Sequence, residues 1–135
     1  MIVENRLFGT SGGEIRGLVW GDSSQPVMLG IHGGFGLAEN FADIGYNLSD
    51  RYCVVALDLP GRGKSFWAKN PATDYRLPRF VELIGEVLDQ LRIGTVRWIG
   101  TSMGGATGIH AAAGALKGRV SHLVLNDVGF TLPAH

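Results

Sequence analysis

Four short and mainly apolar runs divide the chain at regular intervals. They lie at residues 27–31, 53–57, 96–99 and 120–125, and the first ends beside a glycine-rich stretch. Continuous apolar runs of this length are typical of parallel strands that are covered by helices on both faces. The pattern therefore predicts four largely buried strands in one sheet.

The intervals between these runs predict helices. In residues 77–91 the apolar side chains recur at the three- and four-residue spacing of one helical face. Pro78 suits a first helical turn, and Gly94 is a stop signal beyond it. Residues 38–49 predict a shorter helix, and residues 103–116 a helix rich in alanine and glycine. Strands that alternate with helices in this way indicate a parallel α/β sheet with right-handed crossovers.

The amino-terminal segment predicts a different arrangement. Residues 2–8 and 14–20 are two strand-like runs joined by a glycine-containing segment at 9–13, which favours a hairpin. We therefore expect a single α/β domain over residues 1–135. Its mostly parallel sheet has about six strands, an antiparallel amino-terminal hairpin and flanking helices.

Composition narrows the function classes. The 135 residues are 45% hydrophobic and 18% charged, with 12 basic and 12 acidic side chains, which fits one folded domain. No basic cluster exists to bind nucleic acid, and no apolar run reaches the ~20 residues that cross a bilayer. The amino terminus lacks the apolar region of a signal peptide, so we expect a cytoplasmic protein without nucleic-acid or membrane partners.

Cysteine and histidine usage predicts neither a disulfide nor a metal site. Cys53 is the only cysteine and begins an apolar run, so we expect a small buried side chain. The four histidines show no spacing typical of zinc ligands. No cofactor is expected.

The pentapeptide Gly100–Gly104 carries the most specific chemical signal. It reads G-x-S-x-G, follows one of the strand-like runs and precedes the small-residue helix. That context is typical of a nucleophile elbow, in which the turn exposes a serine hydroxyl. Ser102 is then the candidate nucleophile, and the Met103 N–H can donate to an oxyanion. The alternative is that Ser102 only caps the helix.

Two further glycine loops follow neighbouring strands. They are H-G-G-F-G at residues 32–36 and D-L-P-G-R-G-K-S at residues 58–65. A phosphate-binding P-loop would need glycine where Asp58 stands, and a dinucleotide fingerprint would need glycine where Phe66 stands. Both nucleotide-binding interpretations fail. Because the carboxyl ends of parallel strands share one edge, we expect both loops to lie beside the serine.

Taken together, these three loops resemble the α/β-hydrolase superfamily, particularly its esterase-like and carbon–carbon-bond hydrolase branches. The resemblance covers nearly all of the chain but not the lid or the last strands. It implies that Ser102 is the nucleophile and that Met103 and Gly34 donate oxyanion hydrogen bonds, with Phe35 as the second choice after Gly34. It also implies an acid at the position of Asp127, although an aspartate there is structural in many relatives.

The resemblance does not supply the base. The family's histidine follows the eighth strand, and no residue here matches it. His135 lies six residues beyond Gly129, a tether of at most ~20 Å, and can fold back toward the serine. We expect His32 to stabilise its loop by hydrogen bonding. We also expect His32, Phe35 and Phe130 to lie around an acyl or aromatic pocket.

Three functions are compatible with the sequence. The first is a serine esterase that acts on small ester or related acyl substrates through an acyl-enzyme. The second is a non-catalytic or truncated binding module, and the third is an assembly protein built on the same scaffold. The sixth strand would be an open apolar edge, which predicts a homo-oligomer through that edge or a missing carboxyl-terminal portion.

Overall fold

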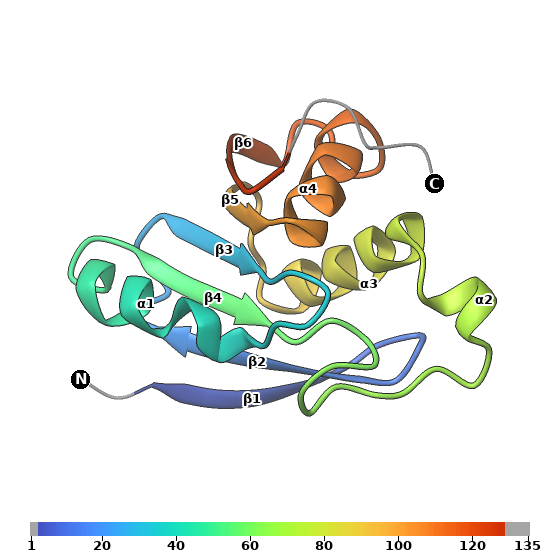
Figure 1. Cartoon of the computed structure of the whole chain (residues 1–135). Coiled ribbons are helices and arrows are strands. Elements are labelled where there is room, and N and C mark those ends of the chain that lie inside the picture. Colours follow the sequence, from blue (N-terminus) through green and yellow to red (C-terminus); the bar gives the residue numbers. More distant parts are fainter. Residues whose placement is uncertain (1–2, 129–135) are drawn as a thin grey trace.

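One twisted six-stranded sheet forms the centre of the molecule (Figure 1). The structure is a computed structural model that describes residues 3–128. The strand order is β1-β2-β4-β3-β5-β6. The strands are β1 Glu4–Gly9, β2 Glu14–Trp20, β3 Val27–Ile31, β4 Cys53–Leu57, β5 Val96–Thr101 and β6 Val120–Asn126.

Strand directions agree with the sequence prediction. β1 pairs antiparallel with β2, and β2 pairs antiparallel with β4. The pairs β3–β4, β3–β5 and β5–β6 are parallel. The expected α/β fold with an antiparallel amino-terminal hairpin is thus confirmed, and the carboxyl ends of the four parallel strands share one edge.

The helices differ from the prediction in three details. They are the 3-10 helix η1 Ala38–Phe41, followed by α1 Ala42–Leu48, α2 Pro71–Asp74, α3 Leu77–Gln90 and α4 Met103–Ala113. The expected helix over 38–49 is therefore split in two. α4 ends three residues before the expected position 116, because Gly114 leaves helical geometry at φ −130°, ψ −118°. The short helix α2 was not predicted.

Helices cover both faces of the sheet, and each face has its own core. On one face α3 buries Phe80, Ile84 and Leu88 against inward residues of β3, β4 and β5. On the other face η1 contributes Phe41, which packs with Trp20 of β2. All five residues of β4 are buried, as expected for a central strand covered on both sides.

The first turn of α4 lies unusually close to the sheet. A Cβ on Gly104 would overlap the carbonyl oxygen of Ile31 at the end of β3, and one on Gly100 would overlap the backbone of the same turn. The buried indole of Trp98 on β5 donates a hydrogen bond to the Gly104 carbonyl at 3.1 Å. Glycine is therefore required where the helix leaves the strand.

β6 lies at the edge of the sheet. It pairs with β5 on one side and has no strand on its other side within residues 3–128. Val124 on this strand is 53% exposed. The prediction of an open sixth-strand edge holds for the described residues.

Gly104→Ala is expected to lower the free energy of unfolding by about 1–3 kcal/mol, because an added methyl group must displace backbone rather than a flexible side chain. Gly94→Ala is the matched control, since its Cβ would meet nothing within 4 Å. That variant should be unchanged or stabilised by up to about 1 kcal/mol. Urea unfolding of the complete protein measures both, and equal effects would contradict the close-approach argument.

Candidate active site at the carboxyl edge of the sheet

Ser102 adopts a backbone conformation that serine rarely occupies. It lies between β5 and α4 with φ 50° and ψ −112°. Its carbonyl accepts hydrogen bonds from the N–H groups of Gly105 and Ala106 at 2.9 and 3.0 Å. The strained residue therefore lies at the point where the helix begins. The Ser102 side chain is exposed and makes no capping hydrogen bond. The capping alternative thus has no support, and the geometry matches a nucleophile elbow.

The histidine-glycine loop lies directly beside this serine. A Cβ built on Gly33 would lie 3.5 Å from the Ser102 Cβ. Within residues 3–128, neither the Gly34 N–H nor the Met103 N–H has a hydrogen-bond partner. Two N–H groups beside the serine are therefore free for an outside acceptor, which an oxyanion hole requires.

His32 is a brace between loops. It is 1% exposed, and its Nε2 accepts a hydrogen bond from the Leu59 N–H at 2.9 Å while Nδ1 lies 2.5 Å from the Gly33 carbonyl oxygen. Burial lowers the pKa of His32, which favours the neutral ring that this pairing needs. The expectation of loop stabilisation agrees with this geometry. The expectation that the ring lies around an open pocket does not.

Asp58 anchors the second glycine loop. Its side chain is fully buried and accepts hydrogen bonds from the Ala38 N–H at 2.7 Å and the Lys64 N–H at 3.0 Å. The guanidinium of Arg16 on β2 lies 3.2 Å from the same carboxylate. The start of η1, strand β2 and the loop after β4 are thereby joined at one carboxyl group.

Arg16 and Glu39 complete this network, and sequence reasoning missed both. The Arg16 guanidinium donates two hydrogen bonds of 2.8 Å to the Glu39 carboxylate. These hydrogen bonds lower the pKa of Glu39 to about 2. The available signal was an arginine inside an apolar strand, E-I-R-G-L-V-W, since a buried cation needs a carboxylate partner.

The remaining predicted site residues are less closely assembled. Phe35 is fully exposed, so no pocket encloses it among residues 3–128. Asp127 follows β6 with φ 59° and is exposed. Its neighbour Asn126 accepts a hydrogen bond from the Ser102 N–H at 2.9 Å, which places Asp127 beside the elbow. Phe130 and His135 lie outside the described residues.

No histidine within residues 3–128 lies free beside Ser102. His110 is in the last turn of α4, about 10 Å along the helix axis from its start. His122 pairs with Arg97 near the beginning of β5, about 13 Å before the edge where Asn126 lies. The same residues contain no cluster of side chains that could hold a metal ion.

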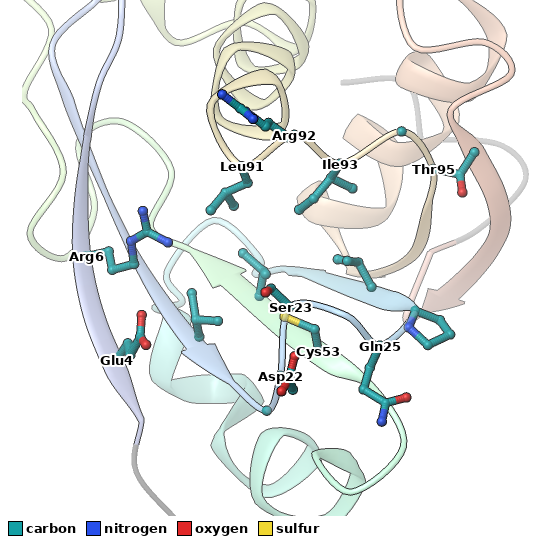
Figure 2. Close-up of a pocket in the computed structure, with 16 residues that line it drawn as sticks. Glu4, Arg6, Asp22, Ser23, Gln25, Cys53, Leu91, Arg92, Ile93 and Thr95 are labelled. Carbon is teal, nitrogen blue, oxygen red and sulfur yellow. The ribbon is translucent and has the colours of Figure 1, made fainter.

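A cavity of about 650 Å³ lies at the opposite edge of the sheet (Figure 2). Its lining includes Val27 and Cys53, the first residues of β3 and β4, and Thr95 just before β5. Cys53 is buried as expected, and burial raises the pKa of its thiol. Because Ser102 follows the carboxyl end of β5, this cavity is separate from the candidate active site.

Comparison with known proteins identifies the family. Residues 26–135 match the profile of the alpha/beta hydrolase fold, and the chain belongs to that family. It is 38% identical over 111 residues to a 3-hydroxybutyrate-oligomer hydrolase of Cupriavidus necator, covering 82% of this chain and 37% of that protein. An esterase of Mycobacterium tuberculosis is 35% identical over 116 residues, covering 86% and 37%.

A solved structure gives the same result. An alpha/beta hydrolase from Novosphingobium aromaticivorans superposes with a TM-score of 0.84 at 32% identity, over 94% of this chain and 45% of that one. The chain spans 37% of the length of each of the two curated relatives.

Among residues 3–128, no helix combines the length and apolar character needed to span a membrane.

The free energy of unfolding should decrease as the pH is lowered below about 6.5. Burial holds the pKa of His32 below 6.5 in the folded chain, so the unfolded chain takes up this proton first. Urea midpoints measured between about pH 7.5 and 5.5 test this effect. Glu39 stays charged over that pH range, so it does not contribute to the change. His32→Gln keeps an acceptor without titrating and should flatten the dependence. Equal slopes in both proteins would contradict a buried neutral His32.

Proposed function

We propose that this chain carries the nucleophile and oxyanion loop of a serine esterase that acts on small ester or related acyl substrates. The main observation in favour is the strained, uncapped and exposed Ser102 beside the loop at residues 32–36. The two curated relatives are an oligomer hydrolase and an esterase, which supports the same reaction class.

In the proposed reaction, the Ser102 Oγ attacks the ester carbonyl carbon and transfers its proton to a base. The carbonyl oxygen becomes an oxyanion that accepts hydrogen bonds from the Met103 and Gly34 N–H groups. A donor of this kind is typically worth about 3–4 kcal/mol of the barrier. The alcohol leaves with a proton from the base, and water then hydrolyses the acyl-enzyme to release the acid and regenerate Ser102.

The proposed base is His135, oriented by Asp127. The backbone of Asp127 lies beside the elbow, because the carbonyl of its neighbour Asn126 accepts a hydrogen bond from the Ser102 N–H. A histidine from a partner chain, or from a part of the protein beyond this sequence, is the alternative source. Either source is compatible with a chain that spans 37% of its curated relatives.

A second candidate function is a binding module that keeps the elbow without turnover. The observation in its favour is that no histidine within residues 3–128 lies free beside Ser102. Substitution of the serine separates the two functions, because only the esterase requires Ser102 for turnover. The cytoplasmic location stays a prediction from sequence.

We also propose self-association through the edge of β6. An unprotected edge strand offers unpaired backbone groups to another strand, and β6 has no neighbour on its outer side within residues 3–128. The exposed Val124 adds apolar surface to the same strand.

Ser102→Ala should lower kcat/KM for p-nitrophenyl acetate by about 10³-fold or more, since the acyl-enzyme cannot form. A fluorophosphonate probe should label Ser102 in the unmodified protein and not in the variant. Ser23→Ala, an exposed serine at the opposite edge, is the matched control and should keep full activity. Unchanged hydrolysis by the complete Ser102→Ala protein would contradict the esterase and favour the binding module.

Val124→Lys should shift the complete protein toward the monomer, because a charge on the edge strand disfavours strand pairing. Size-exclusion chromatography with light scattering at tens of micromolar measures the oligomeric state. Ile109→Lys on α4 changes another exposed apolar residue and should leave the state unaltered. A stable monomer of the unmodified protein would count against pairing through β6.

A further inference from the structure

Arg62 connects two of the loops at the carboxyl edge of the sheet. Its Nε donates a hydrogen bond of 3.1 Å to the Gly34 carbonyl, and its Nη1 donates one of 2.8 Å to the Pro60 carbonyl. The guanidinium also lies over the rings of Tyr75 and Phe80, at 5.5 and 6.0 Å from their centroids. A half-buried cation therefore holds the backbone of the loop that carries the proposed oxyanion donor.

No carboxylate within residues 3–128 forms a salt bridge with Arg62. Arg16 and Arg79 do have such partners: Arg16 pairs with Glu39 and Asp58, and Arg79 pairs with Glu82 and Asp74. Main-chain carbonyls and aromatic faces are thus the partners of Arg62. Its placement serves loop geometry rather than charge neutralisation.

The hydrogen bond from Arg62 to the Gly34 carbonyl constrains a whole peptide group of the loop. Residues 33–36 form a turn closed by a hydrogen bond of 3.0 Å from the Gly36 N–H to the Gly33 carbonyl. The peptide between Gly34 and Phe35 is the middle of that turn, and such a peptide can rotate while the closing bond stays intact. Gly34 has no side chain to oppose this rotation.

A trans peptide is planar, so its C=O and N–H point in opposite directions. By holding the Gly34 carbonyl, Arg62 therefore also fixes the direction of the Phe35 N–H, the second-choice donor of this loop. The Gly34 N–H lies on the preceding peptide, whose Gly33 carbonyl contacts the Gly36 N–H and the His32 ring. A rotated peptide would reverse the direction of the Phe35 N–H and place a carbonyl where that donor had pointed. An oxyanion hole depends on donors that are in place before charge develops.

We propose that Arg62 is a positioning residue of this active site, which fixes the Gly34–Phe35 peptide and so orients the Phe35 N–H as a backbone donor of the loop at residues 32–36. This inference rests on the esterase function proposed above. Arg62 does not touch the reacting atoms in this scheme, and acts through the Gly34–Phe35 peptide.

The charge of Arg62 also acts on His32. Burial is the main cause of the lowered pKa of His32, and the charge of Arg62 adds a smaller lowering against the raising effects of the Gly33 hydrogen bond and the Asp58 charge. A neutral His32 can accept the Leu59 hydrogen bond, which joins the same two loops. Arg62 thus supports the junction both directly and through His32.

The test compares three variants of the complete protein with p-nitrophenyl acetate as substrate. Arg62→Met keeps the packing volume and removes both hydrogen bonds, so kcat should fall about 10- to 100-fold while KM stays within about twofold. Arg62→Lys keeps the charge but reaches only one carbonyl, and kcat should recover partly. Arg79→Met on α3 removes the ion pairs with Glu82 and Asp74 and should keep full kcat.

An inhibitor series separates positioning from general loss of structure. A trifluoromethyl ketone that forms an oxyanion on Ser102 should bind Arg62→Met weaker by the same factor as kcat falls. A non-reactive amide analogue should bind with unchanged affinity. A merely structural role for Arg62 would weaken both ligands together.

Several results would overturn the inference. One such result is an Arg62→Met protein with unchanged kcat and an unchanged urea midpoint. If Ser102→Ala is inactive in the same assay, this result contradicts the role of Arg62 and leaves the esterase proposal in place. If Arg62→Met does not fold, Arg62→Lys with full kcat would have the same consequence. If Ser102→Ala keeps its hydrolytic activity, the esterase proposal is contradicted, and the proposed role of Arg62 is contradicted with it.

Discussion

The contact between the first turn of α4 and the end of β3 is the constraint on which the candidate site depends. Gly104 allows the helix to approach the Ile31 carbonyl, and the buried Trp98 indole holds the Gly104 carbonyl from below. The chain must then turn sharply at Ser102, which takes up the strain as a positive φ. A serine hydroxyl is exposed at this point because its backbone cannot relax into either the strand or the helix.

Loops at the carboxyl edge keep their positions through polar groups that have little access to water. Asp58 joins the start of η1 to the loop after β4, and His32 joins that loop to the one beside Ser102. Removing one partner from a fully buried ion pair typically costs about 3–5 kcal/mol. The same groups that stabilise the fold therefore hold rigid the backbone that would contact a reacting carbonyl.

The chain uses the two edges of its sheet differently. The glycine loops gather where the parallel strands end, while the cavity of about 650 Å³ lies where β3 and β4 begin. Helix termini and unpaired N–H groups are features of the first edge, and they suit a developing negative charge.

Local patterns in the sequence determined the element order, the parallel sheet, the hairpin and the place of the serine elbow, because each depends on residue spacing or on glycine at a particular turn. The same patterns misplaced the end of α4 and gave no sign of α2. Only the tertiary structure decided the distant partners of three side chains. Arg16 meets Glu39 and Asp58, 23 and 42 residues away in sequence. His32 meets Leu59 at a separation of 27 residues, and Arg62 meets Gly34 at a separation of 28. Such contacts depend on how separate loops meet in space, and no short-range periodicity encodes that meeting.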